Sequence, residues 1–285
     1  MRLLRICALL LSLAALPTRA ADEDAKKLIA EQKARAAEKW KLLELGEAAT
    51  ADSASFHVVA PKAMAGKLKG IAATLEKYRA TAAKAAALDL KEAHPGKITA
   101  YLLPDEAALK SFSRRVETRK ADAGATGSYS PDDDRLHVAG FAGEGGTAEM
   151  RAGEMVASLL LRRKAGLATN LPEWLVQGFG RATTYRVFPK DKAVAADKKK
   201  AKAGARKKGA KDVWDGNADS GDHKAMQASL AEYLAYVAGG SAFPKFVLAF
   251  KPGENMMDVA TPAALDAAKL SPDRLDKAWK AWASK

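Results

Sequence analysis

The chain has 285 residues with a 48% hydrophobic content, enough for one large domain or two small ones with a substantial core. Its formal charge of +13 is concentrated, because residues 190–212 contribute +7 and the arginines of residues 1–20 contribute three more, leaving +3 for the rest. A nearly neutral body argues against a fold that binds nucleic acid over its whole surface, and the single cysteine, Cys7, excludes an internal disulfide.

Residues 1–20 have the three-part layout of a secretory signal peptide. Two arginines near the start precede an apolar run at residues 8–16 and a small-residue exit at residues 18–20. The run is about half of the roughly 20 residues that a membrane-spanning helix needs, and no later segment is a better candidate. We therefore expect cleavage near Ala21, no transmembrane helix in the mature chain, and a periplasmic or extracellular location. Retention as an uncleaved anchor is the alternative.

Apolar runs and helical periodicity alternate along the rest of the chain, which predicts an α+β fold. Residues 21–54 are expected to form an N-terminal helical extension, and residues 55–285 the main domain. Strands are expected at 56–59, 98–103 and 136–141. Helices are expected at 22–48, 63–87, 104–112, 147–165, 172–183, 226–237, 243–250, 265–270 and 275–282. Between them, 124–129 is a loop or short strand, 130–134 a solvated turn and 143–146 a loop.

A Lys-, Ala- and Gly-rich segment at residues 187–222 loses apolar periodicity and predicts a disordered basic insert. It is either a solvated linker or an electrostatic clamp on a polyanion such as nucleic acid, acidic polysaccharide or an anionic membrane. The residues that would bind a polyanion are Lys198, Lys199, Lys200, Arg206, Lys207 and Lys208.

Two helical segments carry the functional prediction. Residues 150–161 read MRAGEMVASLLL, and residues 171–181 read LPEWLVQGFGR. Together they resemble the peptidase-MA-like gluzincins, exported bacterial proteins in which a zinc helix bears H-E-x-x-H and the next helix bears P-x-W-L-x-E-G. The residues at the family spacing are Pro172, Trp174, Leu175 and Gly178. The resemblance covers about residues 55–285 outside the insert, and it implies a zincin-like fold with a small sheet and a mostly helical C-terminal part.

The chain departs from this family where the zinc ligands would be. A zinc peptidase uses two imidazoles one helical turn apart and a carboxylate from the next helix. The resemblance assigns the imidazole positions to Gly153 and Ala157 and the carboxylate position to Gln177, none of which is a good zinc ligand. Glu154 keeps the general-base position, but without a metal it is expected to be an ordinary surface or groove carboxylate. A second frame, with Glu149 as the base, also lacks both histidines.

The histidines offer no evident replacement for the lost ligands. His57, His94 and His223 lie in separate predicted elements, whereas His137 lies on the strand that the resembled family runs along its cleft. A relocated zinc site would have to include His137, and a structural role is its alternative. Trp174 is expected in the core rather than in a groove.

The function predicted from these residues is that of an exported, catalytically inactive metallopeptidase-like protein. We expect that zinc is lost and that the former cleft, or another surface, binds a peptide or protein partner, so that the protein acts as a binding or scaffold module. Two alternatives are a hydrolase or peptidase with a relocated or rebuilt site, and polyanion or envelope-surface binding through the Lys-rich insert.

Overall fold

The computed structural model describes residues 16–90, 94–133, 136–217, 220–238, 241–253 and 257–285. The strands are β1 (Ala48–Asp52), β2 (Phe56–Pro61), β3 (Ile98–Leu103), β4 (Gly127–Ser130) and β5 (His137–Phe141). The helices are α2 (Leu16–Leu42), α3 (Leu68–Ala86), α4 (Glu106–Arg115), α5 (Ala148–Ala165), α6 (Glu173–Val187), α7 (Lys192–Ala205), α8 (Ala210–Trp214), α9 (Ser220–Glu232), α10 (Ala242–Leu248), α11 (Thr261–Ala267) and α12 (Pro272–Ala283), with a 3₁₀ turn η1 (Lys62–Lys67) and a π-helical turn η3 (Tyr233–Val237).

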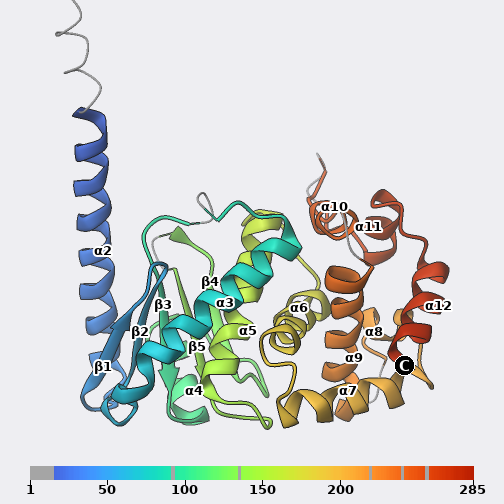
Figure 1. Ribbon diagram of the computed structural model, residues 1–285, viewed down its shortest axis with the longest axis horizontal. Coiled ribbons are helices and arrows are strands. Elements are labelled where there is room, and N and C mark those ends of the chain that lie inside the picture. Colours follow the sequence, from blue (N-terminus) through green and yellow to red (C-terminus); the bar gives the residue numbers. More distant parts are fainter. Residues whose placement is uncertain (1–15, 91–93, 134–135, 218–219, 239–240, 254–256) are drawn as a thin grey trace, which may run out of the picture.

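The strands form one mixed five-stranded sheet in the order β1-β2-β3-β5-β4 (Figure 1). β2, β3 and β5 are parallel to one another in the middle of the sheet. β1 and β4 run antiparallel to their neighbours and form the two edges. The molecule is therefore α+β, with helices packed on the sheet and a further group of helices beyond α6.

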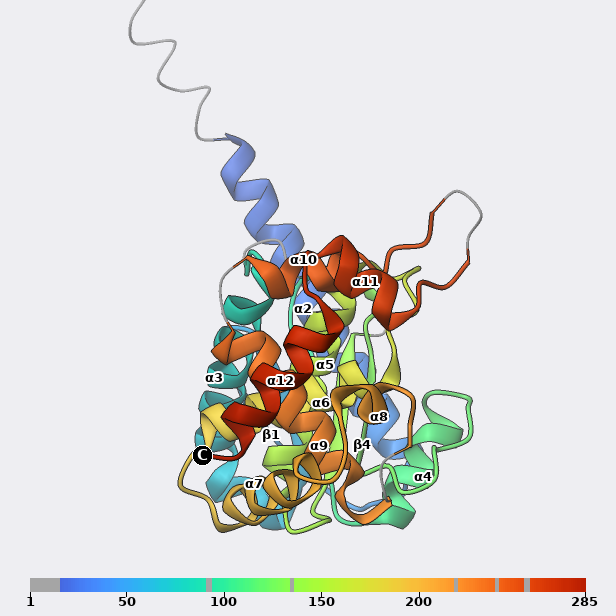
Figure 2. The same ribbon diagram turned by 90° about the vertical axis from the view of Figure 1, so that its right-hand side faces the viewer.

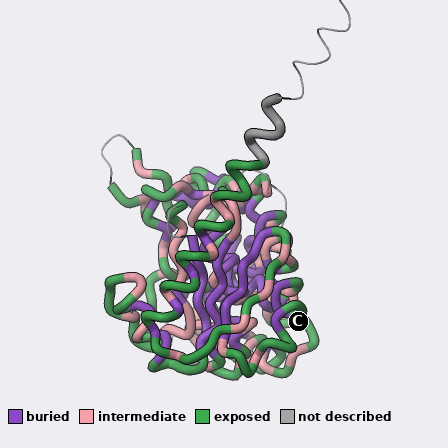
Figure 3. Tube along the Cα trace, turned by 90° about the vertical axis from the view of Figure 1, so that its left-hand side faces the viewer, coloured by how far each residue is buried: buried purple, intermediate pink, exposed green. Residues whose placement is uncertain are grey.

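Alternation along the central strands sends side chains to opposite faces of the sheet, and each face has its own helices. On one face, Val58, Ala100 and Val138 join the main core with α3 and α5. On the other face, Tyr101 and Ala139 join a smaller core with the end of α2 and with α4. Figure 3 shows the buried residues gathered in the middle of the molecule, around the strands.

Helix α6 packs between α5 and α9, and so joins the sheet to the C-terminal helices (Figure 1). Two glycines permit this packing on opposite sides of α6. A Cβ at Gly180 would lie 2.7 Å from the carbonyl oxygen of Glu154 in α5, and one at Gly178 would lie 2.5 Å from that of Gln227 in α9. α10 and α11 lie towards one end of α9 and α7 towards the other (Figures 1 and 2).

The strands expected at 56–59, 98–103 and 136–141 are present as β2, β3 and β5, and the segment at 124–129 contributes to the edge strand β4. The structure confirms an α+β fold with a small sheet. β1 was not predicted, because its sequence AATAD lacks the apolar and β-branched alternation that identifies a strand.

The N-terminal extension at 21–54 is part of the domain, which corrects the predicted boundary at residue 55. β1 belongs to the sheet, and α2 packs on it through buried Ala36, Trp40 and Leu43. The beginning of α2 projects away from the body (Figure 1). Residues 1–15, which include most of the predicted signal peptide, lie outside the described residues, and α2 runs through the expected cleavage position near Ala21.

The segment at 187–222 contains α7 and α8, which corrects the predicted disordered insert. α7 buries Val194, Ala201 and Ala205 and packs against α9. The prediction failed because small residues give a weak hydrophobic period, although alanine is the strongest helix former. Asp191 caps the helix by accepting a hydrogen bond from the Ala193 N–H. Residues 218–219 of this segment lie outside the described residues.

Candidate functional site

A groove of about 460 Å³ lies between β4 and the helices α5, α6 and α9. β4 and the loop before it line one side, and the N-terminal half of α6 with the start of α9 lines the other side. One face of α5 lies between them. The groove therefore follows an edge of the sheet and α5, the helix for which the resemblance predicts a degenerate zinc-helix pattern.

The outer edge of β4 faces away from β5, the strand with which β4 pairs. Phe141 N–H donates to the Thr126 carbonyl at 3.1 Å, and pairing alternates along antiparallel strands. The backbone groups of Ser128 therefore pair with β5, whereas those of Gly127 and Tyr129 point outward. Both residues line the groove, and over the described ranges no other strand pairs with this edge. An open edge of this kind is a template for an added strand.

One face of α5 lines the groove, with the three- and four-residue spacing of a single helical face. Its residues are Arg151, Glu154, Met155, Ser158 and Arg162. Gly153 and Ala157, the positions matched to the family's imidazoles, are not on this face. The residues that directly follow these two positions, Glu154 and Ser158, are one turn apart and do face the groove. Of the four positions assigned from the zinc-peptidase pattern, the structure brings only Glu154 and Gln177 to the groove.

Gly153 is covered by the ring of Tyr78 from α3. A Cβ at Gly153 would overlap the Cε2 and Cζ atoms of that ring, so a side chain there requires Tyr78 to move. Tyr78 is fully buried, and its hydroxyl hydrogen-bonds with Thr184 Oγ1 at 2.8 Å. Burial, and next the negative charge of Glu154, hold the pKa of Tyr78 well above its usual range. The first imidazole position of the family pattern is thus packed core in this protein.

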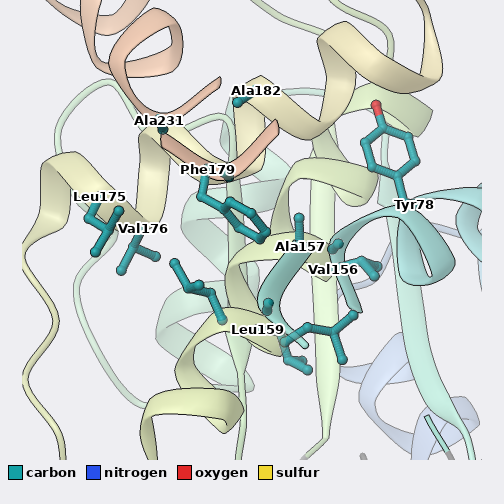
Figure 4. Packing of buried hydrophobic residues seen from close by; sticks show 14 of the residues in the cluster. Tyr78, Val156, Ala157, Leu159, Leu175, Val176, Phe179, Ala182 and Ala231 are labelled. Atoms are coloured by element: carbon teal, nitrogen blue, oxygen red, sulfur yellow. The ribbon is translucent and has the colours of Figure 1, made fainter. Parts of the chain in front are cut away.

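Ala157 and Gln177 occupy two further environments. Ala157 is buried in the main core, where Figure 4 shows it near Val156 and Phe179. Gln177 is exposed on α6, and its amide donates a hydrogen bond to Glu173 one turn earlier. In the part of the chain that the structure describes, no group of three or more His, Cys, Asp or Glu side chains is arranged to hold a metal ion.

Glu154 is a buried ion-pair partner rather than an ordinary surface carboxylate. Its side chain is 8% exposed and that of Arg151 is 4% exposed. Arg151 Nη1 donates to both carboxylate oxygens at 2.8 Å, and the Thr184 hydroxyl donates to Oε1 at 3.3 Å. Sequence reasoning missed Arg151, although its three-residue spacing from Glu154 on one helix was a usable signal.

Arg151 also fixes the loop at residues 143–146. Its Nη2 donates to the carbonyl oxygens of Gly143 at 2.8 Å and Glu144 at 3.0 Å. The Glu144 carboxylate pairs with Lys224 of α9 and with Arg181 of α6. Burial opposes ionisation of Glu144, but the hydrogen bond from Lys224 and the nearby positive charges of Lys224 and Arg181 together lower the pKa of Glu144. These ion pairs tie the sheet to the C-terminal helices beside the groove.

The residues that carry the family spacing in the second motif serve packing. Pro172 is the N-cap of α6, and Leu175 lies in the main core. Trp174 is buried, as expected, and its Nε1 donates to Thr261 Oγ1 at 3.3 Å. Gly178 allows the close approach of α9. These four motif residues lie outside the groove lining, so they support the fold around the groove rather than its chemistry.

No histidine lines the groove in the described part of the chain, although His223 is 2.7 Å from the side-chain amide of Gln227, which does. His137 on β5 faces the α4 side of the sheet, where its Nε2 is 3.0 Å from Glu117 Oε1 and its ring meets Phe112 edge-on. Burial opposes ionisation of Glu117, but the hydrogen bond with His137 lowers the pKa of that carboxyl group. His57 lies on β2 and His223 on α9. The geometry of His137 fits a structural role.

The lowered pKa of His94 predicts that the protein loses stability in mild acid. Burial, and next the charges of Arg79 and Arg163, lower the pKa of His94 to about 4. An unfolded histidine has a pKa near 6.5, so between about pH 4 and 6.5 the unfolded chain binds the proton more readily and stability falls as the pH drops. We expect a loss on the order of 1–2 kcal/mol between pH 7 and pH 5 in urea titrations, and a smaller loss for His94→Gln. Equal losses would contradict this origin.

The predicted polyanion-binding residues lie on α7 and in the turn after it. α7 packs against α9 through buried Val194, Ala201 and Ala205, so the fold fixes the position of this helix. Lys198 is 45% exposed and pairs with buried Glu232 at 3.1 Å. The other predicted residues are exposed or partly exposed: Lys199, Lys200, Arg206, Lys207 and Lys208. Binding of a polyanion stays a prediction, now for a fixed surface rather than a mobile tail.

No protein-family model matches the chain, and a search of curated proteins finds no similar protein. The function is therefore inferred from the groove and its residues. Within the described residues, no helix combines the length and apolar character that crossing a membrane requires.

Proposed function

We propose that this protein is an exported, non-catalytic relative of the gluzincins that holds an extended peptide beside β4. The observation that carries the proposal is the open edge of β4 along a groove. Outward backbone groups at Gly127 and Tyr129 offer main-chain hydrogen bonds to any extended chain, independent of its sequence. Specificity then comes from contacts with alternate side chains of the peptide.

The rest of the groove suits binding better than hydrolysis. Its face on α5 offers Met155 as an apolar contact, and Val176 from α6 lies on the opposite side. Ser158 Oγ is occupied by its hydrogen bond to the Val176 carbonyl at 3.0 Å. Glu154 is held by Arg151, and the positions matched to zinc imidazoles are turned away from the groove. These contacts support a peptidase-like fold whose cleft binds without cleaving.

Tyr129→Pro tests this binding mode. The substitution removes an outward N–H that takes no part in the pairing of β4 with β5, so the protein is expected to fold. We expect about 10-fold weaker binding of peptides from a random, fluorescently labelled synthetic library, because one main-chain hydrogen bond is lost and the proline ring obstructs the edge. Fluorescence polarisation measures the affinity, and mass spectrometry of the recovered peptides shows whether they stay intact.

The matched control lies on the other edge of the sheet. Lys62 N–H donates to the Glu47 carbonyl at 3.0 Å, so by the same alternation Thr50 of β1 also points its N–H outward. Thr50→Pro should leave peptide binding unchanged. Because Tyr129→Pro removes the hydroxyl as well as the N–H, Tyr129→Phe measures the effect of losing the hydroxyl alone. Undiminished binding by Tyr129→Pro would overturn the proposal. Chelator-sensitive cleavage of the library would instead restore the peptidase alternative.

A further inference from the structure

Among the described residues, the cations that line the groove are paired with carboxylates, with one exception. The cations with a carboxylate within 4.0 Å are Arg119, Arg151, Arg181 and Lys224. Arg162 of α5 also lines the groove, but the residues that the structure describes place no carboxylate within 4.0 Å of its guanidinium. The groove thus contains one cation whose charge no described side chain neutralises.

Two hydrogen bonds hold the Arg162 guanidinium next to the open edge of β4. Its Nε donates to the Tyr129 hydroxyl at 3.2 Å, and its Nη1 donates to the Thr169 carbonyl at 3.1 Å. A guanidinium has five N–H donors in a planar fork, so further donors remain for a ligand. The side chain is partly exposed, and its two contacts fix it before any ligand arrives. Arginine held in this way is suited to bind a carboxylate with two hydrogen bonds.

We propose that Arg162 anchors a carboxylate of the peptide that pairs with β4. This inference rests on the proposed function. Tyr129 provides both an outward backbone edge and the hydroxyl that holds Arg162, so a peptide hydrogen-bonded to Tyr129 lies beside the guanidinium. The carboxylate is either the free C-terminus or an Asp or Glu side chain, and the two present the same chemistry to arginine.

A peptide fits this groove better than a phosphate-bearing ligand does. Recognition of phosphate usually recruits several cations, and the other cations of the groove are already neutralised by carboxylates. A carboxylate carries one charge, which matches the single unneutralised guanidinium, and only a peptide also uses the outward backbone groups of Gly127 and Tyr129.

The test measures binding of the full chain to synthetic peptides of random sequence, each made in four forms. One form keeps a free C-terminus and its Asp and Glu residues, one is C-terminally amidated, one carries Asn and Gln in place of Asp and Glu, and one has both changes. We expect the form without any carboxylate to bind about 10-fold or more weakly than the unmodified form. The single-change form that loses affinity identifies the carboxylate that is recognised.

The variant Arg162→Gln should lower the affinity of the carboxylate-bearing forms to that of the carboxylate-free form, and should leave the carboxylate-free form unchanged. Arg162→Lys keeps the positive charge but loses the planar fork of donors, so its affinity for the carboxylate-bearing forms should lie between that of the parent and that of Arg162→Gln. The matched control is Arg163→Gln, because Arg163 follows directly on α5, pairs with Asp133 and does not line the groove. Equal binding of all four forms with no effect of Arg162→Gln would overturn the anchor and keep peptide binding. Absence of binding by every form would overturn both.

Discussion

Gly153→Ala is expected to lower the free energy of unfolding by about 3 kcal/mol, at the upper end of what overpacking costs. The added Cβ would overlap the ring of Tyr78, which is fully buried and held by its hydroxyl bond to Thr184. In a close-packed core such a ring cannot move without disturbing its other neighbours. Urea unfolding at neutral pH measures the change.

Gly70→Ala is the matched control for this substitution. Gly70 lies in α3, the helix that carries Tyr78, and nothing lies within 4 Å of a Cβ built there. The greater helix propensity of alanine should stabilise this variant by up to about 1 kcal/mol. A double-mutant cycle with Tyr78→Ala completes the test, since Gly153→Ala should cost little once the ring is gone. A Gly153→Ala protein as stable as the Gly70→Ala protein would contradict the packing argument.

The close contact between Gly153 and the ring of Tyr78 is also incompatible with the zinc-peptidase pattern. Restoring the pattern would put histidine at Gly153 and Ala157, and neither position faces the groove. A histidine at Gly153 would collide with Tyr78 and a histidine at Ala157 would enter the main core. The helix therefore differs from a zinc helix in its neighbours as well as in its ligands, because α3 contributes a buried tyrosine where a metal ion would need space.

Patterns within single segments predicted much of the sheet. β2, β3 and β5 are apolar runs bounded by turns, and such runs identify buried strands without knowledge of their partners. β1 and α7 were missed or misread because alanine gives little hydrophobic contrast, and their burial depends on what packs against them. Their structure is decided by tertiary contacts rather than by local pattern.

The candidate site was predictable only where it depends on one helix. Glu154 and Gln177 were identified from motif spacing and do line the groove. Tyr78 was not identified, because it meets Gly153 across 75 residues of chain. The relation of Arg162 to Tyr129 is likewise a long-range contact, and no spacing rule connects a strand residue with a helix residue of another segment. Geometry rather than composition decides which charges in the groove stay unpaired.

Glu154→Gln is expected to destabilise the protein by about 3 kcal/mol, because it leaves the Arg151 guanidinium buried without its counter-charge. If Glu154 were instead a general base, the Glu154→Gln variant would lose activity but keep its stability. Exposed Glu106, which pairs with Lys110 one turn away, supplies the control, and Glu106→Gln should cost less than about 0.5 kcal/mol.

The salt dependence of stability further distinguishes the buried pair of Arg151 and Glu154 from the exposed pair of Glu106 and Lys110. Added sodium chloride screens exposed charges but reaches a buried pair poorly, so the cost of Glu154→Gln should stay nearly constant while the small cost of Glu106→Gln vanishes. Because Arg151 also holds the loop at residues 143–146, loss of its partner should loosen that loop, and faster hydrogen exchange at Gly146 would report it. If Glu154→Gln unfolds at the same urea concentration as the parent, the carboxylate is not a structural partner, and its role in the groove is chemical.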